Sequence, residues 1–514
     1  MQQQLPDNTP ILVGAGQYTE HLNKQDAPSL HPPMELAARA CSAAIADAGG
    51  ALLATDIDAI AVIRLFSDSA PLWACPFGRS NNPPQSIAQR LGANPKKRIY
   101  SNVGGNSPLQ LLAELSGAIA RGDIDCALVA GAEAIASQRH AQRSGKELDW
   151  AENYDHPLDS REYTERFAAP AELASGMYLP AHYYALIENL RAHQQGNDEQ
   201  SHRQQMARLL TPLCEVAGDN PFAYFYQDHK AEDLISDANG NYALCVPYNK
   251  LMVAQDAVNQ AAAIVLISAG KARELGIDPD KWVLQLGYAE GNDNCLFERS
   301  DPGTSQAMQA VMSTALQRAN CSQQDMDLLD IYSCFPCAVE AVRDALGITA
   351  DDPRPLTVTG GLPFFGGPGN NYSMHALAEM VTKLRNTTRQ GLVTANGGQL
   401  SKHAAVVLSA NVQEGAISVL DYSELDVAAI DTSTIETVPE CSAPVAGTIL
   451  TYTIIFERKR DDMVVVLAHD TKGARFFASS VDQVTVTQAK DHSPIGKDIV
   501  VWAEEDKYKF KFRV

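Results

Sequence analysis

A β/α pattern that occurs twice is the feature that most constrains the fold of this chain. In each half, short apolar runs alternate with segments that carry apolar residues at helical spacing. The first half has expected strands at 10–17, 57–64, 97–100, 126–134 and 261–268 and expected helices at 33–49, 83–92 and 107–123. The second has expected strands at 282–290, 328–333, 391–398 and 404–410 and expected helices at 305–319, 335–347 and 371–385. This alternation predicts parallel, layered α/β sheets, and its repetition indicates an internal duplication.

Two segments depart from the pattern. Residues 135–260 are rich in His, Arg, Tyr and Asn and carry helix-like stretches such as 181–193, which predicts an inserted helical and loop subdomain. Residues 447–480 alternate with period two and carry turn signals, which predicts a small antiparallel β domain that the alternating tail closes. The expected domains are a first half including the insertion, a second half, an acidic linker and an additional β domain, at 1–280, 281–415, 416–445 and 446–514.

Composition excludes several functional classes. The net charge of −21 argues against nucleic acid or an anionic membrane surface as the main partner, although a small basic pocket for an anionic ligand remains compatible with it. No apolar run approaches ~18 residues, so no membrane span is expected, and we expect no signal peptide because the N-terminus lacks a basic segment before an apolar core. The ten scattered Cys residues favour reduced thiols and a cytoplasmic location. We expect no metal site, because the single Cys334-x-x-Cys337 pair has no second pair.

The stretch NVGGNSPLQ, residues 102–110, forms a small-residue turn between an expected strand and an expected helix. Such a turn is a common place for a catalytic nucleophile or an anion site. Its Ser107 precedes Pro108 and lies three residues before Gln110, a pattern typical of a capping box. We therefore expect Ser107 to be a helix cap, with a role as acyl acceptor as the alternative.

Several motifs resemble the thiolase superfamily over residues 8–415. They are DCALVAGAE at 125–133, PYNKLMVAQDAVNQAAAIVLIS at 247–268, IYSCF at 331–335 and GGLPFFGGPGNN at 360–371. The added segment that begins GTILTYTI resembles the C-terminal domain of thiolase-like proteins of type 1. The resemblance implies a duplicated thiolase fold with a five-layered αβαβα core, an inserted loop subdomain and a small C-terminal antiparallel β domain. It also implies coenzyme A or an acyl-CoA as the substrate, with no covalently bound cofactor, and a homodimer or a monomer.

The residues that ordinary thiolases use are mostly replaced. The nucleophile position falls at Ser107 or Gly105, depending on the side from which the turn is aligned. The Gly-His-Pro loop resembles Gly366-Gly367-Pro368 and lacks the His, and the Cys-x-Gly motif resembles Asn396-Gly397-Gly398 and lacks the Cys. In the His-Asp-Cys-Phe motif the His corresponds to Tyr332, whereas the Cys is kept as Cys334.

The remaining candidates are one thiol and two imidazoles. Cys334 lies where a helix begins, so we expect the helix dipole to lower its pKa. With His375 and His403, which the fold would gather, it is sufficient for acyl transfer. Each also has a structural alternative, because a buried Cys is usually inert and a His can pair with a local group. The expected oxyanion and substrate pocket comprises Tyr332, Asn396, Gly397, Gly398, Gly104, Gly105, Ser107, Gly366 and Gly367, and Arg203 and Arg208 are weaker candidates for the phosphates of CoA.

Two functions follow from the resemblance. The first is a CoA-dependent acyltransferase, similar to acetyl-CoA acetyltransferases of lipid metabolism, that uses Cys334, His375 and His403 for acyl transfer or carbon–carbon bond chemistry. The alternative is a catalytically reduced protein that binds CoA or acyl-CoA, or that serves as a subunit of an acyl-transfer complex.

Overall fold

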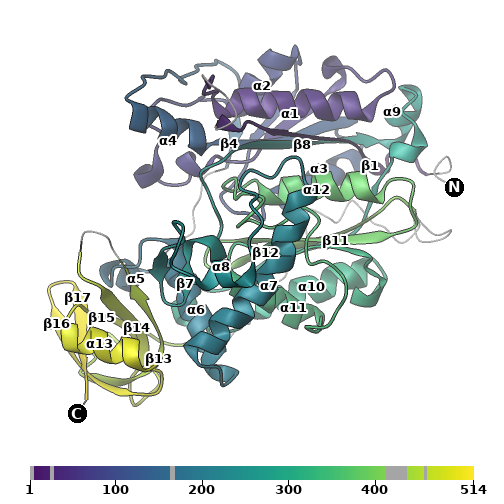
Figure 1. The fold of residues 1–514 in the computed structure, drawn as a ribbon. Coiled ribbons are helices and arrows are strands. Elements are labelled where there is room, and N and C mark those ends of the chain that lie inside the picture. The colour runs from purple at the N-terminus through teal and green to yellow at the C-terminus, as the bar shows by residue number, and fades with distance from the viewer. Residues whose placement is uncertain (1–4, 23–27, 162–167, 412–436, 457–459, 514) are drawn as a thin grey trace.

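The computed structural model describes residues 5–22, 28–161, 168–411, 437–456 and 460–513. Figure 1 shows two sheets, one above the other, with helices outside and between them and a small β domain beside them. The first part of the predicted linker, residues 416–436, lies outside the described residues. Among the described helices none is long and apolar enough to cross a membrane.

The first sheet belongs to the N-terminal half. Its order is β1 (Pro10–Thr19), β8 (Asn259–Ser268), β4 (Cys126–Ala134), β2 (Ala59–Val62), β3 (Lys97–Tyr100) and β5 (Asp159–Ser160). Strands β4, β2, β3 and β5 run parallel, but β8 is antiparallel to both of its neighbours. The prediction of purely parallel sheets is therefore wrong, because β8 returns from the insertion in the opposite direction and lies between β1 and β4. Every residue of β4 and β8 is buried, which explains their continuous apolar sequence.

The second sheet repeats this arrangement in the C-terminal half. Its order is β10 (Leu328–Asp330), β11 (Gln390–Gly397), β12 (Lys402–Ser409) and β9 (Leu284–Asn292). Strands β10 and β11 are parallel, whereas β12 is antiparallel to β11 and to β9. The predicted duplication thus appears in the structure as two mixed sheets.

Helices complete the five layers. The outer layers are α1 (Pro33–Ala48) and α2 (Pro83–Leu91) on one side and α10 (Gln306–Arg318) and α11 (Pro336–Leu346) on the other, and the middle layer is α3 (Ser107–Ala120) and α12 (Tyr372–Leu384). Helix α9 (Ala269–Glu274) follows β8. Helix α1 can pack closely on β1 because Gly14 and Gly16 have no side chain. A Cβ at either position would lie 2.1 Å from a carbonyl oxygen of the helix.

The insertion is mainly helical, as predicted. It contains α4 (Ile135–Ser144), α5 (Pro170–Ala174), α6 (Pro180–Gln194), α7 (Glu199–Asp219), α8 (Ala231–Ile235) and the short strands β6 (Ala243–Cys245) and β7 (Tyr248–Asn249). Residues 182–192 of α6 are all buried, so this helix lies within the molecule and is covered on every side.

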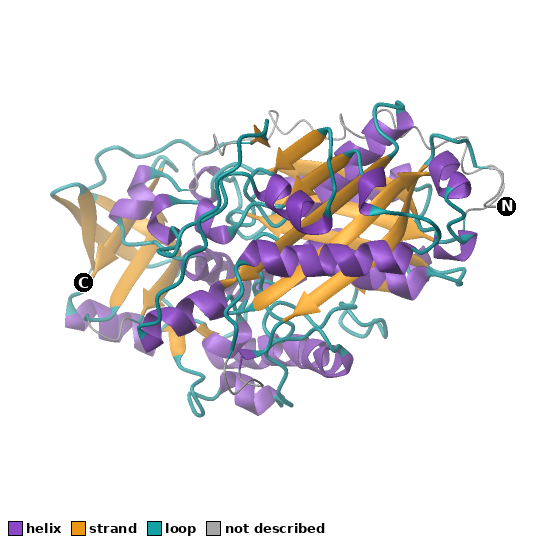
Figure 2. Cartoon of the chain, turned by 90° about the horizontal axis from the view of Figure 1, so that it is seen from above, coloured by secondary structure: helices purple, strands orange, loops and turns teal. Residues whose placement is uncertain are grey.

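The C-terminal domain is a closed barrel. It contains β13 (Ala446–Ile455), β14 (Met463–His469), β15 (Arg475–Ser480), α13 (Gln483–Asp491), β16 (Asp498–Glu504) and β17 (Lys507–Phe512). The order β14-β15-β17-β16-β13 closes because β13 also pairs with β14. The pairing of β15 with β17 is parallel, and the other pairings are antiparallel. Figure 2 shows this domain at the opposite end of the molecule from the N-terminus.

Candidate functional site

The turn before α3 holds Ser107 differently from the predicted capping box. Asn106 is the N-cap and makes no side-chain capping bond, and Ser107 is the first helical residue. The Ser107 hydroxyl donates to the Asn102 carbonyl at 3.0 Å. The capping prediction is wrong because the Asn102 carbonyl, five residues earlier in the turn, lies within hydrogen-bond distance of the Ser107 hydroxyl. No carboxylate or imidazole of the described residues hydrogen-bonds to Ser107, so nothing activates it as a nucleophile.

Gly105 leaves no room for a side chain. A Cβ there would lie 2.4 Å from the Tyr332 hydroxyl oxygen and 2.3 Å from the Asn396 carbonyl oxygen. The Gly105 carbonyl accepts a bond from the Ser373 hydroxyl at 2.6 Å, which fixes the turn against α12. The phenol of Tyr332 therefore fills the space that a side chain at position 105 would occupy.

Cys334 lies in the turn between β10 and α11, two residues before the helix begins, and is only 8% exposed. Its sulfur accepts a bond from the Asn396 side-chain amide at 3.5 Å. The same amide donates to the Tyr184 hydroxyl at 2.8 Å, and the Tyr184 ring stacks on Phe335 with centroids 4.1 Å apart. Cys334, Asn396 and Tyr184 thus form one contiguous cluster, which we call the Cys334 cluster.

Tyr184 is the member of this cluster that the sequence did not reveal. It comes from α6 of the insertion and lies 212 residues from Asn396 along the chain. Its hydroxyl also accepts the Leu400 backbone N–H at 3.0 Å. The only local signal was a pair of aromatic residues on a helix, and such a pair is usually part of a core.

The Cys334 thiol is protonated at neutral pH. Burial raises its pKa to about 11, although hydrogen bonds from Tyr184 and Asn396 oppose this shift. The expectation that the helix dipole lowers this pKa is therefore wrong. Near the start of α11, the Cys337 backbone N–H is bonded to the Glu188 carboxylate at 2.8 Å.

His375 lies on α12 and is fully buried. Its Nδ1 lies 2.7 Å from the Gln17 side-chain oxygen, so Nδ1 donates. The other nitrogen, Nε2, has no hydrogen-bond partner among the described residues. Burial lowers the pKa of His375 to about 3, which makes it a neutral imidazole. Its ring packs on Phe365 with centroids 5.1 Å apart.

His403 lies on β12, directly opposite Asn396 on β11. Side chains of such a pair project from the same face of the sheet. Its Nε2 lies 3.0 Å from the Ser305 hydroxyl and 3.6 Å from Asp293. Burial lowers the pKa of His403, and Asp293 opposes that shift. Among the described residues no hydrogen bond joins any two of Cys334, His375 and His403, and their cooperation stays a prediction.

The glycines predicted to line the pocket fall into two places in the structure, and a pocket formed by all of them stays a prediction. A Cβ at Gly397 would lie 3.0 Å from the Asn106 side-chain oxygen and 3.1 Å from Gly104 Cα. Gly366 and Gly398 have φ of 120° and 62°, which favours glycine at both positions, and Gly367 lies beside residues 254–255. Within the part of the chain that the structure describes, the buried side-chain oxygens of Asn106 and Asn396 accept no hydrogen bond.

The two candidate arginines lie on α7. Arg203 donates to the Ile235 carbonyl at 3.0 Å and to the Asn249 side chain at 2.8 Å, so it ties α7 to the segment after α8. Arg208 is exposed. Phosphate binding by either arginine remains a prediction.

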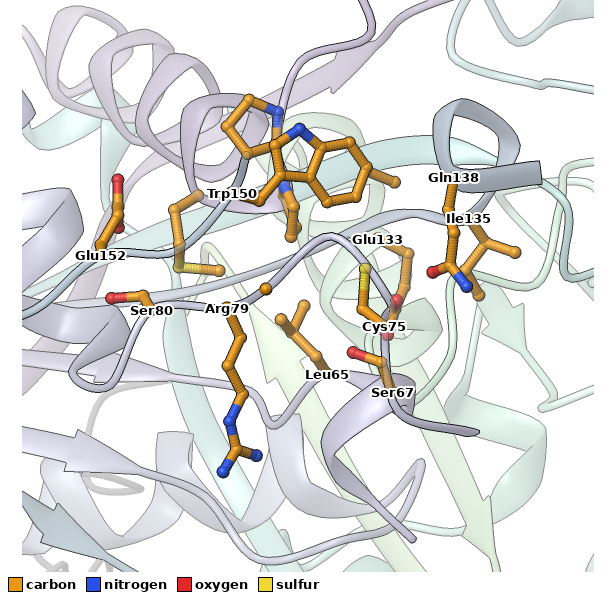
Figure 3. A pocket seen from close by; sticks show the side chains of 15 residues that line it. Leu65, Ser67, Cys75, Arg79, Ser80, Glu133, Ile135, Gln138, Trp150 and Glu152 are labelled. Carbon is orange, nitrogen blue, oxygen red and sulfur yellow. The ribbon is translucent and has the colours of Figure 1, made fainter. Parts of the chain in front are cut away.

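A second pocket lies at the carboxyl ends of β2 and β4 (Figure 3). The buried Glu133 accepts the Phe66 N–H at 2.7 Å through Oε1, and burial raises its pKa to about 8. A Cβ at Gly369 would lie 2.2 Å from the same oxygen, so the glycine-rich loop forms the wall behind this carboxyl. Sequence analysis did not predict this pocket. Its labelled walls are Leu65, Ser67, Cys75, Arg79, Ser80, Glu133, Ile135, Gln138, Trp150 and Glu152.

Comparison with known proteins identifies relatives through structure. No family model and no curated protein matches the chain. The chain is similar to a monomeric SCP2-thiolase-like protein type 1 from Mycobacterium smegmatis, with 30% identity, a TM-score of 0.81 and coverage of 99% of this chain and 100% of that one.

Two further structures share the fold. The Ltp2-ChsH2(DUF35) aldolase has 20% identity, a TM-score of 0.59 and coverage of 79% of this chain and 98% of its own. The acetyl-CoA acetyltransferase from Syntrophomonas wolfei has 16% identity, a TM-score of 0.57 and coverage of 79% and 100%.

Proposed function

Because this chain belongs to the SCP2-thiolase-like type 1 proteins of the thiolase superfamily, we propose that it forms or breaks a carbon–carbon bond next to the carbonyl of a CoA thioester. The observation that carries the proposal is the Tyr332 hydroxyl, which lies where a side chain at position 105 would be. A site arranged in this way has no nucleophile in the turn before α3. Chemistry that needs no acyl-enzyme therefore fits it better than thiolysis.

Tyr332 is suited to hold the thioester oxygen. Its hydroxyl makes no hydrogen bond to the described residues, so it is free to donate to a ligand. Burial raises the pKa of Tyr332 far above neutrality, which keeps this donor protonated. A donor aimed at the carbonyl oxygen stabilises the enolate that forms when a bond to the neighbouring carbon breaks.

Cys334 is suited to transfer a proton. In the cleavage direction, a β-hydroxyacyl thioester loses its hydroxyl proton to water, the Cα–Cβ bond breaks, and the electron pair remains on Cα as an enolate. The Cys334 thiol then gives its proton to Cα, and water reprotonates the thiolate. During this step the Asn396 amide, 3.5 Å from the sulfur, stabilises the transient thiolate. The products are a carbonyl compound and a shortened acyl-CoA.

The role proposed here for the thiol differs from that of an acyl acceptor. A nucleophilic Cys needs a thiolate, usually formed by a neighbouring base. Among the described residues no imidazole hydrogen-bonds to Cys334, and its pKa is about 11. These properties favour a proton donor over a nucleophile.

Exchange of the α-hydrogens tests the proposal. Acetyl-CoA is incubated with the protein in deuterated buffer, and deuterium at the acetyl carbon is measured by mass spectrometry. We expect protein-dependent exchange that is lost in Cys334→Ala, is reduced about 10²-fold in Tyr332→Phe and is unchanged in Cys41→Ala, a buried cysteine of α1. Intact mass should show no acetyl adduct.

Two other outcomes would redirect the assignment. An acetyl adduct that disappears in Cys334→Ala would make Cys334 the acyl carrier and support an acyltransferase. Binding of acetyl-CoA with neither exchange nor adduct would support the reduced acyl-CoA-binding protein.

A further inference from the structure

Helix α6 connects the Cys334 cluster to two other parts of the molecule. Tyr184, Glu188 and Arg191 follow at i, i+4 and i+7, so they lie on one side of the helix. Tyr184 bonds to Asn396, and Glu188 bonds to the start of α11. The hydrogen bonds of Leu186 and Asn189 go instead to the C-terminal barrel. The same helix therefore contacts the site and the barrel.

Glu188 is a buried carboxylate, 1% exposed, whose two oxygens both have hydrogen-bond partners. Its Oε2 accepts the Cys337 backbone N–H at 2.8 Å and the Tyr248 hydroxyl at 2.7 Å. Its Oε1 lies 2.7 Å from His202 Nε2. The pKa of Glu188 stays below its usual value in spite of burial. His202 attracts and hydrogen-bonds the carboxylate, and Tyr248 donates a second hydrogen bond to it. A buried carboxylate of this kind is tolerated only when its oxygens are bonded.

The bond to Cys337 acts on the turn that carries Cys334. Cys337 is the second residue of α11, and Cys334 lies three residues before it. The bond therefore holds the first turn of α11 against α6. Tyr184, one helical turn before Glu188, places its hydroxyl beside the cluster. The backbone that carries the thiol and the group that contacts the thiol are thus fixed by one rigid helix.

The barrel holds this helix from the opposite side. The Thr451 hydroxyl donates to the Leu186 carbonyl at 2.6 Å. The Asn189 amide donates to the carbonyls of Tyr452 and Val246, both at 2.9 Å. The bonds of Thr451 and Tyr452 connect β13 of the barrel to the helix that reaches the site, and the bond to Val246 connects the helix to the end of β6.

We propose that Glu188 is a positioning residue for Cys334, and that the C-terminal barrel acts on the site by holding α6 in place through Asn189 and Thr451. The inference rests on the proposed function, because it assigns Cys334 as the reacting group. It also assigns the added barrel a role within its own chain.

Two readouts test it. The first is the rate of acetyl-CoA α-exchange, separated into kcat and KM. In Glu188→Ala we expect kcat to fall about 10²-fold, as expected for a displacement of about 1 Å at the reacting group, with KM changed less than about twofold. Glu188→Gln keeps an oxygen that can accept the Cys337 N–H and should recover most of the loss. Glu172→Ala, a matched control at a buried carboxylate of α5, should leave kcat unchanged.

The second readout needs no activity. The alkylation rate of Cys334 by iodoacetamide is measured by peptide mapping relative to that of Cys75, a half-buried cysteine of the N-terminal half. We expect the ratio to change at least about fivefold in Glu188→Ala and in Asn189→Ala, and less than about twofold in Glu188→Gln and Glu172→Ala. Asn189→Ala keeps the test valid if Glu188→Ala does not fold.

The results separate this inference from the proposed function. If the wild type shows no exchange but the alkylation ratio responds as expected, the positioning role stands and the proposed reaction is wrong. If folded Glu188→Ala and Asn189→Ala both keep the wild-type ratio and kcat, the positioning role is wrong. A loss of kcat in Glu188→Ala with an equal rise in KM, without rescue by Glu188→Gln, would also overturn it, because that pattern reports general destabilisation.

Discussion

Replacing Glu133 by Gln should stabilise the protein at alkaline pH and have little effect at acidic pH. The carboxyl is 3% exposed and accepts one backbone bond, from Phe66, through Oε1. Gln has nearly the same shape and keeps that acceptor, and it replaces the ionisable OH by an NH2 group that does not titrate. Glu133 Oε2 makes no hydrogen bond to a described residue, so ionisation would leave a poorly compensated buried charge.

The magnitude follows from the two pKa values. The pKa is about 8 in the folded protein and 4.5 in the reference state. Because the folded value is raised, the protonated carboxyl contributes fully below pH 4.5, and this contribution is lost as pH rises through the folded pKa. Between pH 5.0 and pH 8.5 this group alone lowers the free energy of unfolding by about 4 kcal/mol. Glu133→Gln does not suffer this loss.

Equilibrium unfolding in urea at the two pH values provides the measurement. The difference in unfolding free energy between Glu133→Gln and wild type should be about 4 kcal/mol more favourable to the variant at pH 8.5 than at pH 5.0. Other titrating groups cancel in this comparison. Ser67→Ala, an uncharged pocket substitution, should show the same difference at both pH values. An equal difference for Glu133→Gln at both pH values would refute the reasoning.

Three further predictions concern the candidate site. Gly105→Ala should lower the free energy of unfolding by about 3 kcal/mol or more, since its Cβ would meet the Asn396 carbonyl oxygen at 2.3 Å; a variant with wild-type thermal stability would contradict this. Alkylation of Cys334, followed by peptide mapping between pH 7 and 11.5, should increase toward a midpoint near 11, and a midpoint below 8 would restore the nucleophile assignment. Tyr184→Phe should slow Cys334 alkylation at pH 9 by about tenfold, because it removes a hydrogen bond that lowers this pKa; an unchanged or faster rate would contradict that role.

The local sequence predicted most of the elements because their signals are local. The spacing of apolar residues, Pro at helix starts and Gly at helix ends can each be recognised within a short stretch of sequence. The helix expected at 83–92 is accordingly observed as Pro83–Leu91. The motif IYSCF located Cys334 and Tyr332 correctly at the start of α11. The sequence did not predict that β8 is antiparallel to β1 and β4, because an apolar run looks the same for either strand direction.

Long-range contacts determined the chemistry of the site. From its position before a helix, Cys334 is expected to have a lowered pKa, yet burial raises that pKa to about 11. The spacing of Ser107 and Gln110 predicts a capping box, but the Ser107 hydroxyl donates to the Asn102 carbonyl instead.

The sequence alone thus determined the duplicated five-layer fold, the family and the absence of the usual nucleophile. Only the tertiary structure decided that Tyr332 fills the place beside Gly105 and that Tyr184 reaches the thiol. The physical reason is distance along the chain. A pKa and a hydrogen bond depend on every group within a few ångströms, and here Tyr184 and Asn396 are 212 residues apart along the chain and Gly105 and Ser373 are 268 residues apart.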